Sequence, residues 1–77
     1  MNKKRAVFGE AERSEILAAQ KKQHPVHVTR RLQALKLKVV DGLRSEEAGK
    51  LAGMHRTSVN RIVKRYQEEG IEAIVGV

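Results

Sequence analysis

Residues 48–63 read Ala48-Gly49-Lys50-Leu51-Ala52-Gly53-Met54-His55-Arg56-Thr57-Ser58-Val59-Asn60-Arg61-Ile62-Val63. Their small, glycine and aliphatic residues are spaced as two short helices joined by a tight turn require. Gly53 follows the apolar end of the first helix, where the chain needs a left-handed residue that glycine adopts without steric cost. Ala48, Gly49 and Ala52 share a small face over which a second helix can cross closely. The pattern predicts a helix-turn-helix, although a helical hairpin within a bundle has the same aliphatic spacing.

Basic residues are concentrated between Arg30 and Tyr66. This block holds ten Lys or Arg against three acids, and the rest of the chain carries six of each sign, so the block accounts for the whole formal charge of +7. No acid occurs from His55 to Gln67. A carboxylate there would be repelled by a phosphate polyanion, so motif and charge together favour DNA binding over a merely solvated basic face. A membrane-surface role fits less well, because Phe8 and Tyr66 are the only aromatic residues.

The chain has 77 residues and no cysteine. This length predicts one small domain, and the lack of cysteine excludes disulfides and thiolate metal sites. No apolar run approaches the length of a membrane span, and the apolar stretch after the basic start is too short for a secretory signal. We therefore expect a cytoplasmic protein associated with the nucleoid.

The chain outside the motif is also expected to be helical, because the apolar–polar alternation typical of strands never persists. A first helix should end near His24, since the residue before Pro25 is disfavoured in helical geometry. Pro25 itself suits the first turn of the next helix. That helix, over 26–41, carries one buried stripe, and its apolar residues Leu37 and Val40 fall off the stripe, which predicts cover on two sides.

The two helices of the motif should begin at Arg44 or Ser45 and at about residue 56. The second should stop at Gly70, where Ile71 can fold back onto the helix. Core positions on this second helix are Val59, Ile62 and Tyr66. The expected architecture is an all-α, homeodomain-like helix-turn-helix bundle of about four helices with a short C-terminal turn. It divides into a basic flexible arm (1–7), a DNA-binding domain (8–70) and a short apolar tail or linker start (71–77).

Three segments in order carry a resemblance to a known family. They are Arg30-Arg31-Leu32-Gln33-Ala34-Leu35 through Asp41-Gly42-Leu43, the turn motif, and Arg65-Tyr66-Gln67-Glu68-Glu69-Gly70-Ile71-Glu72-Ala73-Ile74. Together they resemble the N-terminal DNA-binding region of bacterial insertion-sequence transposases of the mariner-like superfamily, over nearly the whole chain after the basic arm. The resemblance implies recognition of the terminal inverted repeats of a mobile element. It also implies that the parent protein has a catalytic domain beyond this chain.

The sequence departs from that family's pattern at three positions. Gly49 stands where alanine is usual, which costs about 1 kcal/mol in a helix interior. Arg44 and His55 stand where a capping serine is usual. We expect Ser45 and Thr57 to take over as caps and to shift each helix start by a residue or two. These departures predict a less stable fold.

Candidate DNA contacts lie on and around the second helix of the motif. Resemblance to helix-turn-helix proteins places the start and outer face of this helix toward base edges, where arginine pairs with guanine and the threonine methyl contacts thymine. Asn60 suits either a phosphate or an adenine. The arm residues Lys3, Lys4 and Arg5 either contact the backbone or minor groove or form a solvated tail. Predicted base contacts are His55, Arg56, Thr57, Asn60 and Arg61, and predicted phosphate contacts are Arg30, Arg31, Arg44, Ser45, Ser58, Lys64 and Arg65.

No catalytic residue, metal site or cofactor is expected. His24 and His27 are three residues apart, but Pro25 lies between them and no third ligand is near in sequence. Asp41 is the only aspartate, and a short helical chain lacks the rigid sheet on which two-metal phosphoryl chemistry gathers its carboxylates. We therefore expect a non-enzymatic chain.

Three functions remain open at this point. The first is sequence-specific binding of double-stranded DNA by a transposase-type module that recognises mobile-element ends. The second is a stand-alone small transcriptional regulator of phage or mobile-element origin, on the same fold. The third is a helical protein-interaction module whose basic face meets an acidic partner. The apolar tail is a candidate homodimer contact, and no membrane partner is expected.

Overall fold

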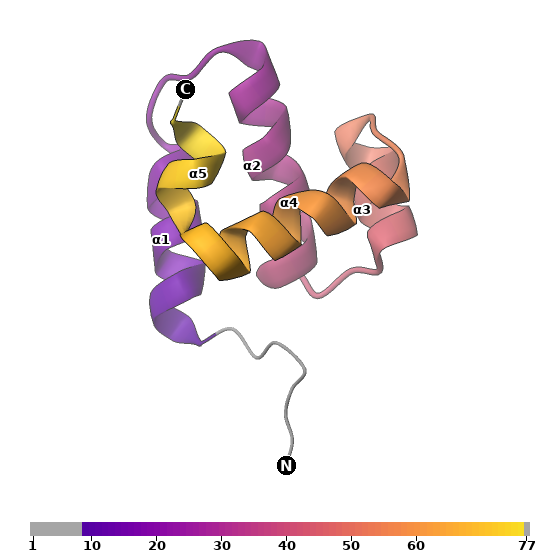
Figure 1. Cartoon of the computed structure of the whole chain (residues 1–77), viewed down its shortest axis with the longest axis horizontal. Helices are drawn as coiled ribbons and strands as arrows, with labels where there is room; N and C mark the ends of the chain where they lie inside the picture. The colour runs from indigo at the N-terminus through magenta and orange to yellow at the C-terminus, as the bar shows by residue number, and fades with distance from the viewer. Residues whose placement is uncertain (1–8, 77) are drawn as a thin grey trace.

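Five helices follow one another along the chain in the computed structural model, which describes residues 9–76 (Figure 1). No strand occurs among these residues, so the expected all-α class is confirmed. The predicted basic arm, 1–7, lies outside the described residues. The helices are α1 (Glu10–Gln20), α2 (Val26–Val39), α3 (Ser45–Ala52), α4 (Arg56–Glu69) and α5 (Ile71–Val75). α5 is the short C-terminal turn that the sequence predicts.

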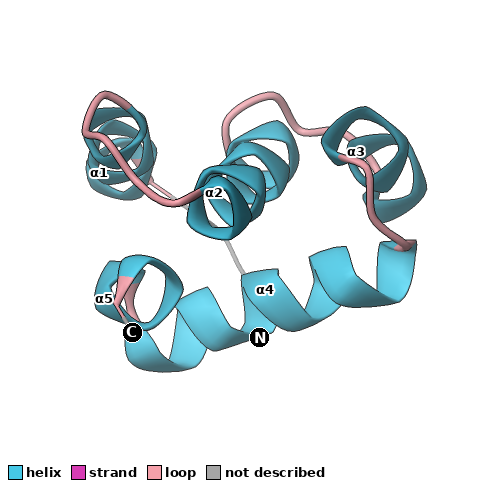
Figure 2. Cartoon of the chain, turned by 90° about the horizontal axis from the view of Figure 1, so that it is seen from above, coloured by secondary structure: helices cyan, strands magenta, loops and turns pink. Residues whose placement is uncertain are grey.

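Helix α4 crosses the others and has one free side. Figure 2 shows α1, α2 and α3 together on one side of α4. α5 turns back from the end of α4 at Gly70 and contacts α1 and α2. The opposite side of α4 is therefore left uncovered by any described helix.

Two hydrophobic clusters hold the bundle together, and α2 contributes to both. The expectation that α2 is covered on two sides is confirmed, because Leu37 packs in the second cluster rather than in the first. Ile62 and Val63 of α4 are partly buried and pack against both clusters. The first cluster consists of Ile16, Val28, Leu32, Leu35, Val39, Tyr66 and Ile74, and the second of Ala34, Leu37, Ala48, Ala52 and Val59.

The ends of α2 differ slightly from expectation. Pro25 is the N-cap of the helix and not part of its first turn. The Pro25 carbonyl accepts hydrogen bonds from the amides of Val28 (3.0 Å) and Thr29 (2.9 Å), which leaves the missing proline N–H outside the helical ladder. α2 ends at Val39, two residues earlier than the sequence pattern suggests.

Candidate nucleic-acid interface

The turn between α3 and α4 is built on Gly53. Gly53 adopts the left-handed conformation (φ 76°, ψ 37°), as the sequence predicts. The amides of Gly53 and Met54 both donate hydrogen bonds to the carbonyl of Gly49, the latter at 2.8 Å. These bonds end α3 at Ala52, so only three residues separate it from the start of α4 at Arg56. The short turn sets the crossing of the two helices.

Gly49 lies on α3 where the backbone of residues 54–56 passes close to the helix. It is buried, and a Cβ atom built on it would lie 2.5 Å from the carbonyl oxygen of Met54 and 3.4 Å from the backbone nitrogen of Arg56. The expectation that Gly49 is part of a small face that permits close approach is therefore confirmed, and the expected cost of glycine in the helix is not the whole of its effect. Its lower helix propensity is offset by a backbone approach that any other residue would obstruct.

His55 is the cap of α4. Its Nδ1 accepts a hydrogen bond of 3.1 Å from the amide of Thr57, and the Thr57 hydroxyl lies 3.0 Å from the same nitrogen. The prediction that Thr57 replaces His55 as the cap is wrong, because an imidazole nitrogen can accept from an orphan amide as a serine oxygen does. Only the other ring nitrogen of His55 remains to meet an external group.

The start of α3 has no side-chain cap. Arg44 occupies the N-cap position and its carbonyl accepts from the amide of Ala48 at 2.8 Å. Ser45 is the first helical residue, so the expectation that it becomes the cap is also wrong. The Ser45 hydroxyl instead donates a hydrogen bond to Oδ1 of Asn60 in α4. This contact places Asn60 on the side of α4 that faces the start of α3 and leaves its NH₂ group available.

The uncovered side of α4 carries basic and polar side chains. Thr57, Arg61 and Lys64 are exposed and lie opposite the buried Val59 and Tyr66, by the helical repeat of 3.6 residues. The structure therefore brings two of the predicted base contacts and one predicted phosphate contact onto one face.

Two acids limit the basic surface of α4. Glu68 lies on the same side of α4 as Lys64, about one turn further along, and Glu69 lies on the side of Arg65, with which it forms an ion pair. The basic surface is consequently confined to the first three turns of α4. Arg56, at the start of the helix, is exposed.

One flank of α4 faces the start of α3, and the opposite flank faces α2 and α5. Arg61 and Arg65 of α4 line a hollow there together with Arg31 of α2. Ala73 and Ile74 of α5 complete its wall. Sequence reasoning missed these two residues, because a small and an aliphatic residue in a tail carry no signal for a binding surface.

Most cations of this region are without an anionic partner. Among residues 9–76 the ion pairs are Lys36 with Asp41, at 2.8 Å, and Arg65 with Glu69, at 3.9 Å. The second pair is long and solvent-exposed, so it neutralises Arg65 only weakly. The field around α4 thus stays positive and attracts polyanions.

The described part of the chain has neither a cluster of metal ligands nor a membrane-spanning helix. Across residues 9–76, no three His, Cys, Asp or Glu side chains are grouped so that they could hold a metal ion. None of the helices in this range has the length and apolar character needed to cross a membrane.

A tight turn between two crossing helices, the second basic and uncovered, defines a helix-turn-helix domain. The family model of the homeodomain-like domain matches residues 27–75, so the chain belongs to this family. Because such domains place their second motif helix in the major groove, the family indicates double-stranded DNA as the partner. Helix α1 precedes the matched residues. Comparison with curated proteins and with solved structures returned no match.

Proposed function

We propose that this chain binds double-stranded DNA sequence-specifically by inserting α4 into the major groove. The observation that carries the proposal is the uncovered basic side of α4, which Figure 2 shows turned away from α1, α2 and α3. The major groove is about 12 Å wide and admits one α-helix. An uncovered helix with exposed cations and no acid in its first three turns fits that groove.

Base reading is assigned to the first half of α4. Arg61 and Thr57 lie on the uncovered face, where arginine can pair with guanine and the threonine methyl can contact thymine. His55 and Arg56 sit at the entering end of the helix. Asn60 keeps its NH₂ group for an acceptor on a base, since its oxygen is engaged by Ser45.

Backbone contacts are assigned to the periphery of that face. Phosphate contacts orient a DNA-binding helix without reading sequence. Lys64 and Ser58 suit this role on α4, and Arg44 and Ser45 suit it at the start of α3, where free helix amides attract an anion.

We further propose that the recognised DNA is the terminal repeat of a mobile element. The support is the resemblance of three ordered segments to the DNA-binding region of insertion-sequence transposases, which extends beyond the turn motif that repressors and activators share. On this proposal the catalytic chemistry belongs to a domain outside these residues.

The test is selection of duplexes from a random pool, followed by anisotropy titrations of the selected and random duplexes at several salt concentrations. Sequence-selective binding is expected. Arg61→Ala should cost about 1–3 kcal/mol and relax the preference at one base position, whereas Lys22→Ala, on the turn between α1 and α2, should leave both unchanged. Indifference to sequence would contradict base reading. A selected motif found upstream of genes and absent from mobile-element ends would contradict the transposase assignment.

A further inference from the structure

A groove lined by arginines runs along the flank of α4 that lies away from Ser45. It consists of two adjoining hollows of about 100 and about 360 Å³, which share Arg31, Arg61 and Ile62. Arg65 lines the first hollow and Arg30 the second. We call this surface, formed by Arg30, Arg31, Arg61 and Arg65 over Ile62 and Ile74, the arginine groove.

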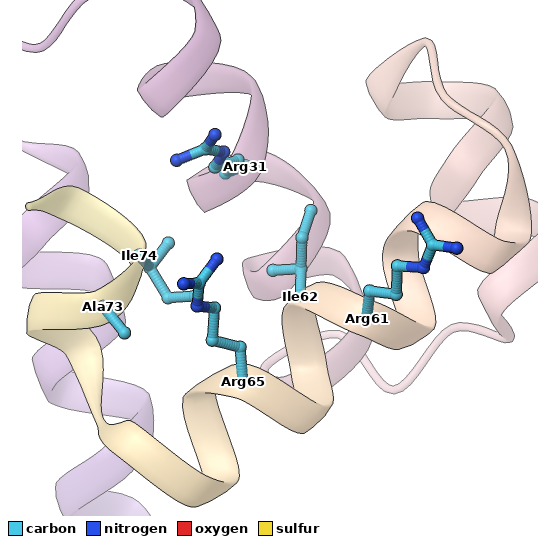
Figure 3. Close-up of a pocket in the computed structure, with 6 residues that line it drawn as sticks. All are labelled: Arg31, Arg61, Ile62, Arg65, Ala73 and Ile74. Carbon is cyan, nitrogen blue, oxygen red and sulfur yellow. The ribbon is translucent and has the colours of Figure 1, made fainter. Parts of the chain in front are cut away.

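The arginine groove gathers positive charge from two helices. In Figure 3 the side chains of Arg61 and Arg65 extend from α4 toward the side on which Arg31 of α2 lies. No carboxylate lines either hollow. Among residues 9–76, Arg65 alone of the four arginines has an ion pair, the long exposed one with Glu69.

This arrangement favours an anion as the ligand. Arg31 is half-buried, so its charge is less well solvated than that of a surface arginine. Guanidinium groups stay protonated at any physiological pH, so a bound anion would reduce their mutual repulsion. The planar fork of a guanidinium matches the oxygens of a phosphate.

The apolar part of the groove bears on the kind of phosphate. Ile62 and Ala73 are partly exposed and present apolar surface beside the arginines, whereas Ile74 is only 1% exposed and lies beneath them. A free phosphate has no carbon atoms that could pack on such a surface, whereas the deoxyribose next to a phosphodiester has carbon atoms that can. The combination of cationic walls and an apolar floor thus fits a nucleic-acid backbone.

The position of the groove relative to α4 points to the same occupant. A helix in the major groove is bordered by the backbone of one strand on each side. The Ser45–Asn60 contact marks one flank of α4, and the arginine groove lies on the other. In Figure 1 the start of α3 lies below α4 and the start of α2 above it.

We propose that the arginine groove binds the phosphodiester backbone of one DNA strand, the strand that borders α4 on the flank away from Ser45. This inference rests on the proposed insertion of α4 into the major groove. It gives α5 a role, because Ala73 forms the wall of the groove beside Arg31 and Arg65. Through Arg30, Arg31 and Arg65 the contact positions the domain and reads no bases, whereas Arg61, at the border of the groove, keeps the base-reading role proposed above.

The first test replaces Arg31, which lies on α2 and outside the helix that reads bases. Arg31→Ala should weaken binding to selected and random duplexes alike, by roughly three- to tenfold, because one charge-assisted phosphate contact is lost. The slope of log affinity against log salt should fall by about 0.9, the value for one phosphate. Lys22→Ala removes the same charge at the turn between α1 and α2 and should leave the slope unchanged. An unchanged slope for Arg31→Ala would overturn the proposal.

The second test introduces a negative charge on α5 and leaves all the arginines in place. Ala73→Glu places a carboxylate at the wall of the groove and should weaken duplex binding, whereas Ala73→Gln, which is nearly the same size, should bind more tightly than Ala73→Glu. Circular dichroism checks that both variants keep the helical fold. Equal affinities for the two variants would contradict the groove assignment.

Two further outcomes distinguish this proposal from base reading by α4 and from a site for a small anion. If the wild-type chain binds duplexes without sequence preference, base reading by α4 fails, while the salt slope of Arg31→Ala on random duplexes still supports or contradicts the groove. If Arg31→Ala weakens binding of inorganic phosphate but leaves duplex binding and its salt slope unchanged, the groove is a small-anion site and the proposal is overturned.

Discussion

The phenolic hydroxyl of Tyr66 in α4 donates a hydrogen bond of 2.8 Å to Oε1 of Glu15 in α1. The Tyr66 side chain is only 4% exposed and packs in the first hydrophobic cluster beside Ile16 of α1. Helix α1 precedes the residues that the homeodomain-like family covers, yet it is joined to α4 by packing in the first hydrophobic cluster and by a polar contact. The position of α4 therefore depends on α1 as well as on the helices of the motif.

Tyr66→Phe should lower the free energy of unfolding by about 1 kcal/mol, because it removes the hydrogen bond to Glu15 while the ring stays in the core. Urea denaturation followed by circular dichroism measures the change. Glu15→Gln keeps an acceptor for the phenol and should cost less. A Tyr66→Phe variant as stable as the wild type would show that the bond contributes nothing.

The stability of the fold should fall at alkaline pH. Burial raises the pKa of the Tyr66 phenol above its ordinary value of 10.0, and the hydrogen bond and negative charge of Glu15, with that of Glu12, raise it further. Below pH 10 the phenol is neutral in both states, so its stabilising contribution is fully present; above pH 10 the unfolded chain loses the proton first and the contribution declines.

Tyr66 is the only tyrosine and the chain has no tryptophan, so near-ultraviolet absorbance reports its titration directly. The titration of the native chain should lie at higher pH than that of the chain in denaturant. Urea denaturation above pH 10 should show a smaller loss of stability in Tyr66→Phe than in the wild type, since the variant lacks the titrating group. Coincident titrations of the native and denatured chain would contradict the burial argument.

Gly49→Ala should destabilise the domain, by about 1–3 kcal/mol, although alanine is the better helix former. The added Cβ would lie 2.5 Å from the Met54 carbonyl oxygen, and that oxygen belongs to the rigid turn. Thermal unfolding measures the effect, with Lys50→Ala as an exposed control on the same helix. A more stable Gly49→Ala variant would mean that the turn moves aside without cost.

His55→Ala should cost about 1 kcal/mol of stability, the usual worth of a helix N-cap. The loss follows from the orphaned amide of Thr57, which donates to His55 Nδ1 at 3.1 Å. His55→Ser restores a capping oxygen and should recover most of the loss in urea denaturation. If serine is no better than alanine at this position, the imidazole has a role other than capping.

Glu68→Gln should strengthen binding to random duplexes by roughly two- to threefold at low salt, because it removes a negative charge from the face that we propose approaches DNA. The control is Glu10→Gln, which removes the same charge at the start of α1. Anisotropy titrations compare the two variants. Equal effects of the two substitutions would mean that only net charge matters and that α4 does not face the duplex.

Much of the fold is readable from local sequence. The left-handed turn at Gly53, the two-sided burial of α2 and the end of α4 at Gly70 follow from residue types and spacing within a few positions. The concentration of positive charge in the central block is likewise a property of composition. Helical periodicity and glycine geometry depend on residues within one or two helical turns, so a short stretch of sequence is enough to predict their effects.

Other features depend on residues that are distant in sequence. The contact of Tyr66 with Glu15 joins helices at opposite ends of the chain, and the two residues are 51 positions apart. The expectations that failed, at the caps of α3 and α4, were drawn from propensities alone.

The amino-acid sequence by itself determined the helical class, the turn and the sign of the charge, because these depend on neighbouring residues. The tertiary structure decided which face of α4 stays uncovered and which groups share each flank. Arg31, Arg65 and Ile74 come together only when α2, α4 and α5 pack around a common core. A binding surface assembled from three helices is a product of long-range packing, and no periodicity within a single helix encodes it.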